Sequence, residues 1–491
     1  MTSATSASSV TAPVRGLFVG GAWVAPADAS GAAGRTTAVV SSADGEALGH
    51  VAAAGPADVD AAVAAARGAA DEWSASTPAE RAAALRHIAG FLAAAEEELA
   101  RTISLEVGTP IRLSRRLQVG LPVAVLERFA DDVGAVAFET LVAGGSRILR
   151  EPVGVVGAIT PWNYPLHQVV AKFGAALAAG CAFVVKPSDV APLSLFTLAE
   201  ATVAVGLPPG LFNLVTGGVD VGEALVAHPG VDHVSFTGST AVGAQVAARA
   251  AGRLARCSLE LGGKSASVVL DDLDDAALQR AVRTSVGNAF LNSGQTCTAW
   301  SRLVVPEGRQ AQVVELVVEA AAKLRVGHPL DEGTKLGPLA TPAQVERVRR
   351  YVAIGRRDAR PVFEGEVPEG LPAGGNYVAP TVFADVPPAS ALAQEEVFGP
   401  VLAVSTYRDG DEDDAVRIAD GTAYGLAAAV WSGDPALAAR VARRLRAGQV
   451  DVNGAAFNPG APFGGVKGSG SGRELGIHGI EQFTELKSIQ E

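Results

Sequence analysis

Between Pro152 and Leu270 the chain alternates short runs of β-branched and apolar residues with longer Ala-rich stretches of helical character. The predicted strands are Val153–Ile159, Ala182–Lys186, Leu211–Val215, His233–Phe236 and Ser267–Leu270. Strands that alternate with helices are typical of βαβ units, which build a parallel sheet covered by helices on both faces. Such sheets bind ligands where loops leave the carboxyl ends of the strands, so the residues that follow each run are candidates for a site.

Helical segments flank this region. Asp58 is the expected N-cap of an Ala-rich helix that runs to Trp73. The segment Thr77–Glu80 is a capping box that opens a helix predicted to continue to about Glu106. A second α/β region is expected from about Asp274. Further elements are predicted as helices near Leu278–Phe290 and Gln310–Leu324, a hairpin at Leu17–Val24 and a strand in the tail from Glu481.

The composition narrows the classes of function. With 491 residues, of which 48% are hydrophobic, the chain can bury a large core, and this excludes global disorder. Its 40 Lys and Arg against 52 Asp and Glu give a net charge of −12, so nucleic acid is not an expected partner. We interpret the densest basic run, Arg440–Arg446, as the solvated face of a helix.

Cysteine usage and the N-terminus predict a cytoplasmic protein. Three widely spaced cysteines are not a disulfide framework and favour a reducing compartment. Residues Met1–Gly16 lack the apolar core of a signal peptide, and the longest uncharged apolar run, Phe173–Val185, is shorter than the ~20 residues that span a bilayer. Neither a membrane nor a metal ion is expected as a partner, since the seven His residues show no metal-ligand spacing.

Cys297 is the candidate nucleophile. It lies in the segment NSGQTCTA, where Gly294 allows a sharp turn and Thr296 and Thr298 leave room around the sulfur. A lone cysteine is more often a small buried apolar residue, and Cys181 and Cys257 are interpreted in that way.

Glu260, in the segment LELGGKS, is the candidate base. A carboxylate in an apolar strand is costly to bury unless it is used or paired. Burial raises the pKa of such a group and makes it a base near neutral pH. The alternative is a structural ion pair with Lys264.

Asn163, in the segment PWNYP, is the candidate oxyanion donor. It follows the first predicted strand, between two prolines that fix the backbone, and its amide offers N–H groups to an oxygen. The alternative is that it caps a helix that begins at Pro165.

Two further segments follow strands and suit a nucleotide. KPSD, from Lys186 to Asp189, offers an ammonium and a carboxylate to ribose hydroxyls. FTGSTAVG, from Phe236 to Gly243, is a strand, a turn and a helix start whose N–H groups can hold a pyrophosphate. A solvated turn and an ordinary strand–turn–helix remain the alternatives.

Two Gly-containing segments complete the set: EEVFGPV, from Glu395 to Val401, and PFGGVKGSGSGREL, from Pro462 to Leu475. Each could be a loop over the site or an ordinary surface loop.

The seven segments together, in this order along nearly the whole chain, resemble the aldehyde dehydrogenase superfamily. The spacing between Glu260 and Cys297 also fits that family.

The resemblance implies an α/β fold with three parts. A Rossmann-like cofactor domain with a parallel sheet is expected over residues 1–130 and 152–261, and an α/β catalytic domain over 262–465. A small β extension, 131–151 with 466–491, is expected to join subunits into a homodimer or homotetramer.

The resemblance also implies the catalytic roles. Cys297 would attack an aldehyde carbonyl, with Asn163 and the Cys297 backbone N–H as the oxyanion hole. After hydride transfer, Glu260 would activate water to hydrolyse the thioester. Lys172 and Glu474 match positions implicated in a proton path from that base.

NAD is the cofactor that the resemblance implies. Asp189 replaces a Glu that is usual in the family; its carboxylate should repel a 2′-phosphate, yet its shorter side chain leaves NADP possible. The positions that match cofactor-binding residues are Thr160, Trp162, Lys186, Ser188, Asp189, Gly238, Ser239, Gly243, Leu261, Glu396 and Phe398.

The substrate tunnel is implied by the same matching. Its residues would be Tyr164, His167, Gln168, Ala171, Thr296, Thr298, Phe457 and Phe463. Three aromatic residues and the lack of any Arg among them favour an apolar or aromatic aldehyde. A semialdehyde or another polar aldehyde, a CoA-acylating activity and a cysteine hydrolase remain as alternatives.

Overall fold

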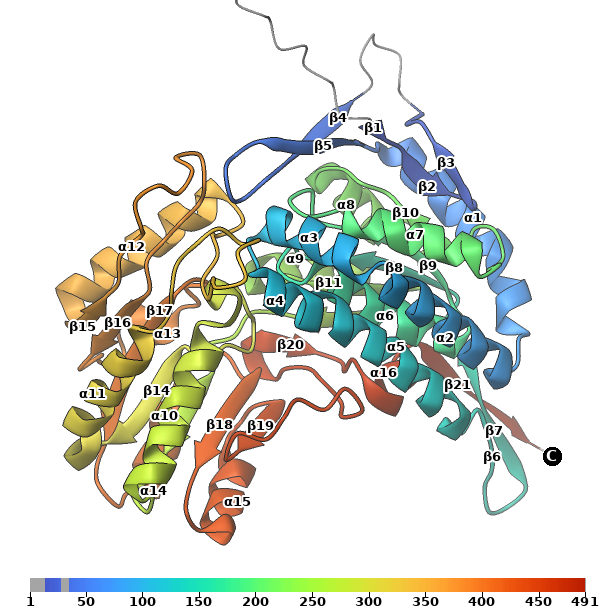
Figure 1. The fold of residues 1–491 in the computed structure, drawn as a ribbon. Helices are drawn as coiled ribbons and strands as arrows, with labels where there is room; N and C mark the ends of the chain where they lie inside the picture. Colours follow the sequence, from blue (N-terminus) through green and yellow to red (C-terminus); the bar gives the residue numbers. More distant parts are fainter. Residues whose placement is uncertain (1–13, 28–34, 491) are drawn as a thin grey trace, which may run out of the picture.

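The computed structural model describes residues 14–27 and 35–490, so the segment up to residue 13, most of the expected N-terminal tail, lies outside the described residues. The described chain contains an eight-stranded and a seven-stranded sheet and two three-stranded sheets, with helices between them. In Figure 1 the larger sheet lies in the centre and right of the molecule and the seven-stranded sheet at the left. The expected α/β fold class is confirmed.

The first sheet contains four of the five strands that the alternation of runs predicts. The fifth run, Ser267–Leu270, forms β13 (Ala266–Val269) in the other large sheet, so its expected place in the same sheet is wrong, and Arg256–Glu260 is the fifth parallel strand instead. The five central strands pair in parallel with one another, whereas the hairpin predicted at Leu17–Val24 and the short strand Gly470–Ser471 pair antiparallel at the two edges. In spatial order the strands are β20 (Gly470–Ser471), β12 (Arg256–Glu260), β11 (His233–Thr237), β8 (Val155–Ile159), β9 (Ala182–Lys186), β10 (Phe212–Leu214), β2 (Leu17–Val19) and β3 (Ala22–Val24).

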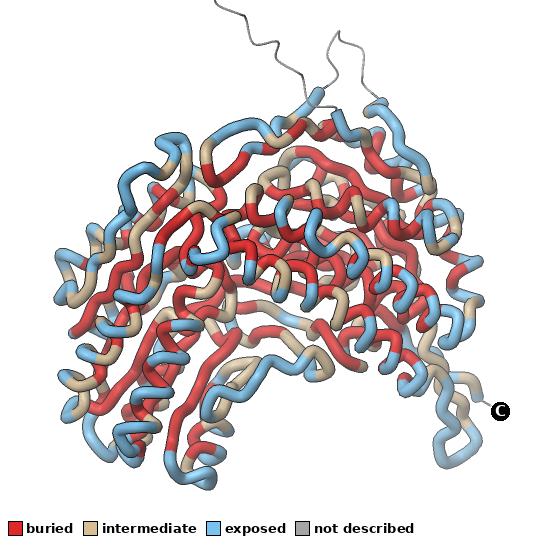
Figure 2. The backbone as a smooth tube through the Cα atoms, in the orientation of Figure 1, coloured by how far each residue is buried: buried red, intermediate tan, exposed pale blue. Residues whose placement is uncertain are grey.

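Helix α6 (Pro165–Ala179) anchors this half of the core. It begins at Pro165, whose missing N–H needs no partner there, and it ends at Gly180 in a left-handed conformation. Every residue of α6 except His167 is buried, and α6 packs against α5 (Leu121–Asp132) and β9. Figure 2 shows the buried backbone running through the centre of the molecule.

Two helix predictions need correction. The N-cap of α1 (Pro56–Ser74) is Gly55, and Asp58 is three residues into the helix, where its carboxylate accepts a hydrogen bond from the Gly55 N–H at 2.8 Å. The long helix expected up to Glu106 is two helices, α2 (Pro78–Ala94) and α3 (Glu96–Val107), because Ala95 departs from helical geometry. The acidic residues that start α3 suit a helix N-terminus.

The second sheet carries the helices predicted after Asp274, which are α10 (Asp275–Ala289) and α11 (Gln310–Ala321). All neighbouring strands are parallel except the edge pair β15–β16. In spatial order they are β15 (Arg360–Glu364), β16 (Thr381–Ala384), β17 (Val401–Tyr407), β14 (Arg302–Pro306), β13 (Ala266–Val269), β18 (Ala427–Trp431) and β19 (Gln449–Val452).

The small sheets lie at the edges of the molecule. β7 (Ser146–Pro152) pairs with β6 (Glu139–Leu141) and with β21 (Thr484–Gln490), so the strand predicted in the tail forms. The other small sheet contains β1 (Val14–Arg15), β5 (Ala47–Ala52) and β4 (Thr36–Val40). Within 466–491, β20 belongs to the first sheet, and α16 (Gly476–Glu481) packs on α5 and α6.

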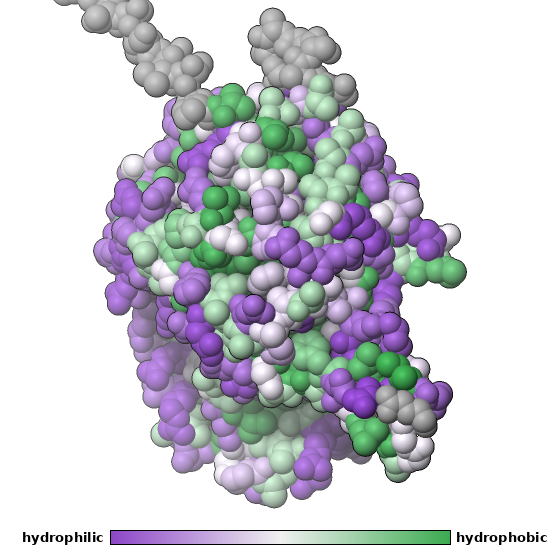
Figure 3. All heavy atoms as spheres, turned by 90° about the vertical axis from the view of Figure 1, so that its right-hand side faces the viewer, coloured by the Kyte–Doolittle hydropathy of each residue, from purple (hydrophilic) through white to green (hydrophobic). Residues whose placement is uncertain are grey.

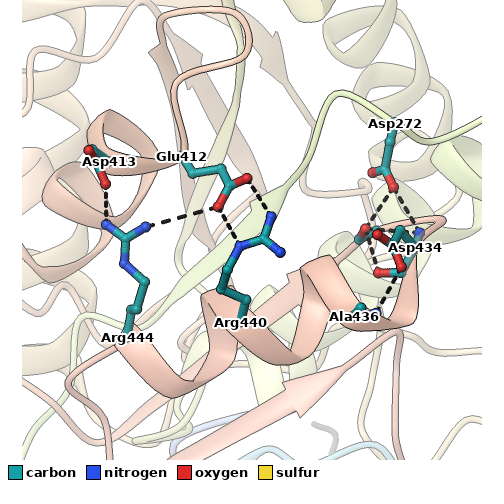
Figure 4. Close-up of polar contacts among 8 residues, drawn as sticks. Asp272, Glu412, Asp413, Asp434, Ala436, Arg440 and Arg444 are labelled. Atoms are coloured by element: carbon teal, nitrogen blue, oxygen red, sulfur yellow. Dashed lines mark hydrogen bonds and ion pairs between the residues drawn. The ribbon is translucent and has the colours of Figure 1, made fainter.

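The basic run at Arg440 lies mostly on α15 (Pro435–Arg444), as expected for a solvated helix face. The Arg440 guanidinium lies 2.8 Å from a Glu412 carboxylate oxygen, and Arg444 forms an ion pair with Asp413, both acids being on α14 (Glu412–Asp420) (Figure 4). These two arginines are therefore neutralised within the fold.

Over the described ranges no helix is both long and apolar enough to cross a membrane.

Candidate active site

Four loops leave the carboxyl edge of the first sheet side by side. The segments Thr160–Asn163, Lys186–Asp189 and Gly238–Ser239 follow β8, β9 and β11, and Glu260 ends β12. The Cys297 loop comes from the other half of the chain, between α10 and β14. The candidate residues therefore meet between the two large sheets.

The Cys297 loop is strained. Asn292, Ser293 and Gly294 have φ angles of 51°, 56° and 76°, three consecutive residues in the left-handed region. That conformation is costly for residues with a Cβ, and it persists only where the surroundings enforce it. At Gly294 a Cβ would collide with the carbonyl oxygen of Gly399.

Buried hydrogen bonds hold this loop in its strained conformation. Thr109 Oγ1 donates to Asn292 Oδ1 at 2.7 Å, and the Ala340 N–H donates to Gln295 Oε1 at 2.9 Å. Each bond satisfies a polar group that would be costly to leave unpaired. The backbone that presents Cys297 is thus fixed from both sides.

The Cys297 thiol sits in an acidic, desolvated environment. Burial, with the carboxylates of Glu396 and Glu260, raises its pKa to about 12. The thiol is therefore neutral near pH 7, and a reaction that uses the thiolate must also remove this proton.

Asn163 is buried and lines the same cavity as Cys297. Its Nδ2 donates to the carbonyl oxygen of Gln295 at 3.0 Å, and its own carbonyl oxygen accepts from Gln118 Nε2 at 2.9 Å. The N-cap residue of α6 is Tyr164, so Asn163 is not the cap that the alternative supposed.

Glu260 is buried, and neither carboxylate oxygen has a hydrogen-bond partner among the described residues. The alternative ion pair with Lys264 does not form within the described chain. Burial and the nearby Glu474 carboxylate raise the pKa of Glu260 well above its usual range, against the lowering effect of Lys172 and Arg473. Such a carboxyl is a base near neutral pH rather than a permanent anion.

The carboxyl of Glu260 faces Gly464. A Cβ at Gly464, whose φ is 148°, would lie 2.6 Å from Glu260 Oε1, so glycine leaves the space that this carboxyl occupies. Glu260 lines neither of the two cavities that Cys297 lines. In this conformation it lies behind the cavity wall.

Lys172 and Glu474 form a buried ion pair beside Glu260. Lys172 comes from α6, and Glu474 is held by reciprocal backbone hydrogen bonds with Phe463 at 2.7 Å. The structure thus brings both residues of the expected proton path next to the candidate base.

The first cavity, of about 250 Å³, is lined by Cys297, Asn163 and six of the eleven expected cofactor residues. The Trp162 and Phe398 rings meet edge to face with centroids 5.6 Å apart, and Glu396 Oε1 accepts the Gly263 N–H at 2.9 Å. The six are Trp162, Gly238, Ser239, Leu261, Glu396 and Phe398.

The other five expected cofactor residues lie outside that lining. Lys186 Nζ lies 3.8 Å from Asp189 Oδ1, which also accepts the Gly217 N–H at 3.1 Å. Thr160 is buried with Oγ1 unpartnered. Ser188 Oγ accepts the Val190 N–H at 3.3 Å, and Gly243, on α9 (Thr240–Ala251), packs against Leu261.

The second cavity, of about 780 Å³, also contains Cys297. Seven of the eight expected tunnel residues line it: Tyr164, His167, Gln168, Thr296, Thr298, Phe457 and Phe463; Ala171 does not. Tyr164 Oη lies 2.8 Å from Thr296 Oγ1, and burial raises the pKa of Tyr164. Burial and Lys172 lower the pKa of His167 to about 4, so its imidazole is neutral.

Several lining residues were not predicted, and one of them is charged. No Arg is among the eight expected tunnel positions, but Arg116 lines the same cavity. The spacing of Arg116, Leu117, Gly120, Leu121 and Ala124 follows one helix face and could have indicated a shared surface, although not what it faces. Other unpredicted lining residues are Thr284, Leu291, Trp300, Gln449, Asp451 and Glu474, the last expected only as a relay.

Over the described ranges, no three His, Cys, Asp or Glu side chains are grouped to hold a metal ion.

A family model described as "Aldehyde dehydrogenase family" matches residues 29–489. The chain belongs to the aldehyde dehydrogenase family. The resemblance that the seven segments indicated is thereby confirmed.

Individual aldehyde dehydrogenases match over nearly their whole length. The chain is 41% identical to 3-succinoylsemialdehyde-pyridine dehydrogenase of Pseudomonas sp, covering 97% of this chain and 98% of that one. It is 41% identical to geranial dehydrogenase of Castellaniella defragrans, covering 96% and 98%.

Solved structures of the family match equally well. A mutant aldehyde dehydrogenase C of Pseudomonas syringae in complex with NAD+ and octanal has a TM-score of 0.93 and 43% identity, covering 97% of this chain and 96% of that one. A Mycobacterium tuberculosis aldehyde dehydrogenase in complex with NAD+ has a TM-score of 0.93 and 41% identity, covering 98% and 99%.

Proposed function

We propose that this aldehyde dehydrogenase oxidises an aldehyde to the carboxylic acid, with NAD as the hydride acceptor. One observation carries the proposal. Cys297 lines both cavities, so a thiol lies where the cleft lined by cofactor candidates meets the tunnel. A nucleophile at such a junction can hold an aldehyde next to a hydride acceptor.

In the first step the Cys297 sulfur bonds to the carbonyl carbon and forms a thiohemiacetal. The thiol proton must leave as this bond forms, because the thiol is neutral in the free protein. Negative charge develops on the former carbonyl oxygen, and we assign the Asn163 amide, which lines the same cavity as Cys297, and the Cys297 N–H as its hydrogen-bond donors.

The cleft has the features that NAD requires. In its lining Thr237 Oγ1 is buried without a partner among the described residues, and Ser239 starts helix α9, whose N-terminus suits a pyrophosphate. When bound, NAD would accept the hydride of the thiohemiacetal carbon and so leave a thioester on Cys297. We assign Lys186 to the adenine ribose, Glu396 to the nicotinamide ribose, and Trp162 and Phe398 to packing against the nicotinamide side.

Hydrolysis of the thioester then needs an activated water. Glu260 is assigned as the base, since its raised pKa lets it take a proton from water near neutral pH. Its carboxyl must turn from Gly464 toward Cys297 to do so. Lys172 and Glu474, paired next to it, would pass the proton onward.

We propose that the enzyme prefers NAD over NADP. The Asp189 carboxylate lies at the end of β9 beside Lys186, where an adenine ribose would be held. It would repel a 2′-phosphate there.

The substrate is proposed to be apolar or aromatic around its carbonyl end. Phe457 and Phe463 lie edge to face with centroids 6.4 Å apart in the tunnel wall, which also includes Trp300 and Leu291. Such a lining favours apolar chains. Relatives described as acting on geranial and crystallised with octanal support this choice, whereas another, named for a semialdehyde, keeps a polar aldehyde open.

The β6–β7–β21 sheet is proposed to join subunits. Leu141, Val142 and Leu486, on or beside it, are apolar and exposed to 68%, 40% and 63%. Figure 3 views this side of the molecule and shows apolar areas interleaved with hydrophilic ones. Apolar surface of this kind favours a contact between copies of the chain.

The test is NADH formation with hexanal and benzaldehyde, with and without CoA. NADH and free acid without CoA support the proposal, and a Cys297→Ser variant should produce no NADH. If the thioester is released only to CoA, the acylating alternative replaces it. Hydrolysis of an ester alone, without any NAD-dependent oxidation, would identify a cysteine hydrolase.

A further inference from the structure

Arg116 occupies an irregular part of the backbone at the edge of the tunnel. It lies on η1 (Ser114–Gly120), a π-helical segment that runs directly into α5. Pro122 has no N–H to donate to the preceding turn, which is consistent with wider turns just before it. The result is that Arg116 lines the cavity together with Leu117 and Leu121.

Arg116 also lines a neighbouring cavity of about 440 Å³, which shares Gly287 and Leu291 with the tunnel. Arg116 is exposed, so this part of the shared wall lies toward the outside of the molecule. Arg112 and Lys335 line this neighbouring cavity too, and no carboxylate does.

Arg116, Arg112 and Lys335 share a lack of partners in the described part of the chain. No hydrogen bond or ion pair joins the side chains of Arg116, Arg112 or Lys335 to any residue in the described ranges. The neighbouring Arg115, in contrast, pairs with Glu97 and Glu332 at 2.7 Å each. In a chain of net charge −12, a cavity lined by three unpaired cations is suited to an anion.

Two acidic residues also line the tunnel, and among the described residues neither forms an ion pair with these cations. Glu474 is paired with Lys172, and the Asp451 carboxylate accepts a hydrogen bond from Gln449 at 2.9 Å. The wall of the cavity that both Cys297 and Arg116 line also includes Leu291, Trp300, Phe457 and Phe463. The tunnel thus combines an apolar wall with an unpaired guanidinium at its edge.

We propose that Arg116, supported by Arg112 and Lys335, is a specificity-determining residue that binds a carboxylate at the far end of the substrate. The preferred substrates are then long aldehydes with an apolar chain and a terminal anionic group, the ω-oxo carboxylates. This inference rests on the proposed aldehyde oxidation at Cys297. It extends the apolar substrate given above and does not replace it.

The length of the substrate follows from the size of the cavity that both Cys297 and Arg116 line. A cavity of about 780 Å³ accommodates a ligand far larger than a four-carbon aldehyde. A short semialdehyde that reacts at Cys297 would leave its carboxylate in the apolar part of the tunnel, where an unpaired charge is costly. Octanal would fill the tunnel without using Arg116.

The test compares octanal, 8-oxooctanoate, its methyl ester and succinic semialdehyde on the full-length enzyme with NAD. In the unaltered protein we expect 8-oxooctanoate to have the lowest KM of the four. Arg116→Gln should raise the KM for 8-oxooctanoate by about tenfold, the size of a partly exposed charge-assisted bond, with kcat nearly unchanged. Octanal and the methyl ester should be unaffected, and Arg116→Lys should recover part of the loss.

The matched control is Arg101→Gln, an exposed arginine on α3 that lines neither cavity. Its kinetics should equal those of the unaltered enzyme with all four aldehydes. Equal effects of Arg116→Gln on octanal and on 8-oxooctanoate, or no effect on either, would overturn the inference while leaving aldehyde oxidation intact. If the unaltered enzyme forms no NADH with any of the four, the proposed function itself fails.

Discussion

Asn163 Nδ2 donates a hydrogen bond to the carbonyl oxygen of Gln295, 3.0 Å away and two residues before Cys297. One amide thus touches the strained loop that carries the nucleophile and lines the cavity in which the oxyanion would form. In the proposed mechanism this one side chain would therefore both hold the loop in position and stabilise the oxyanion. This sets the first expectation for a variant.

Asn163→Ala should lower turnover by on the order of 100-fold or more, because removing one oxyanion donor typically costs ~3–4 kcal/mol. Steady-state NADH formation measures it. NAD affinity and thermal stability, followed in parallel, separate a loss of chemistry from a displaced Cys297 loop. Turnover near that of the unaltered enzyme would remove Asn163 from the mechanism.

Glu260→Gln should separate the two halves of the reaction. The thioester still forms, so a burst of NADH equal to the number of active sites is expected, but hydrolysis stalls because the amide is no base. Rapid mixing with absorbance detection distinguishes the burst from the steady state. An unchanged steady-state rate would show that another group activates the water.

Asp189→Asn should weaken the preference for NAD. The amide oxygen can still accept the Gly217 N–H, but the negative charge that would repel a 2′-phosphate is gone. We expect kcat/KM with NADP to rise by about fivefold relative to NAD, since screened charge effects of this kind amount to ~1 kcal/mol. A variant with an unchanged ratio would place cofactor discrimination elsewhere.

Much of this architecture could be predicted from the sequence, and the exceptions have physical reasons. Most strands of the first sheet were predictable because both faces of the sheet are buried. A strand that is buried on both faces has a continuous apolar sequence. The helix break at Ala95 was not, because alanine favours helix in every local context. Tertiary packing decides that break.

The candidate site also has parts that the sequence predicts and parts that it does not. The motif segments around Asn163, Glu260 and Cys297 could be named because glycines, prolines and an isolated carboxylate are unusual in apolar surroundings. The orientation of the Glu260 carboxyl toward Gly464 was not predictable, since it depends on a segment about 200 residues later in the chain. Arg116 was missed for a related reason: its helical turn carries no signal of the cavity that it lines.

His233 should make the protein sensitive to acid. It is buried with Nδ1 unpartnered, and burial, Arg256 and Lys172 lower its pKa to about 3. An unfolded His takes up a proton below about 6.5, whereas the folded one does not until about 3. The stability that it contributes is therefore complete above pH 6.5 and is lost as the pH falls, by at most ~1.4 kcal/mol per unit.

Chemical denaturation at several pH values tests this. His233→Gln should lose less unfolding free energy than the unaltered protein between pH 6.5 and pH 4, although His167 keeps its own contribution. His87→Gln, at an exposed position, is the control and should follow the unaltered protein. Parallel curves for all three proteins would contradict the prediction.

Lys172 and Glu474 should shift the pH dependence of thioester hydrolysis in opposite directions. The Glu474 carboxylate raises the pKa of Glu260, and the Lys172 ammonium lowers it. Glu260 acts as a base only when ionised, so the hydrolysis rate rises with pH through that pKa. Glu474→Gln should move this rise to lower pH and Lys172→Met to higher pH, each by on the order of one unit.

The double variant Lys172→Met with Glu474→Gln is the internal control, because it removes both charges and should return the profile close to that of the unaltered enzyme. Lys172→Met alone leaves a buried carboxylate unpaired and should cost about 3–5 kcal/mol of stability, so its profile is measured at low temperature on protein shown to be folded. Single-turnover hydrolysis of the thioester reports the step directly. Shifts of the same sign in both single variants would mean that this ion pair supports the fold around Glu260 and does not set its proton affinity.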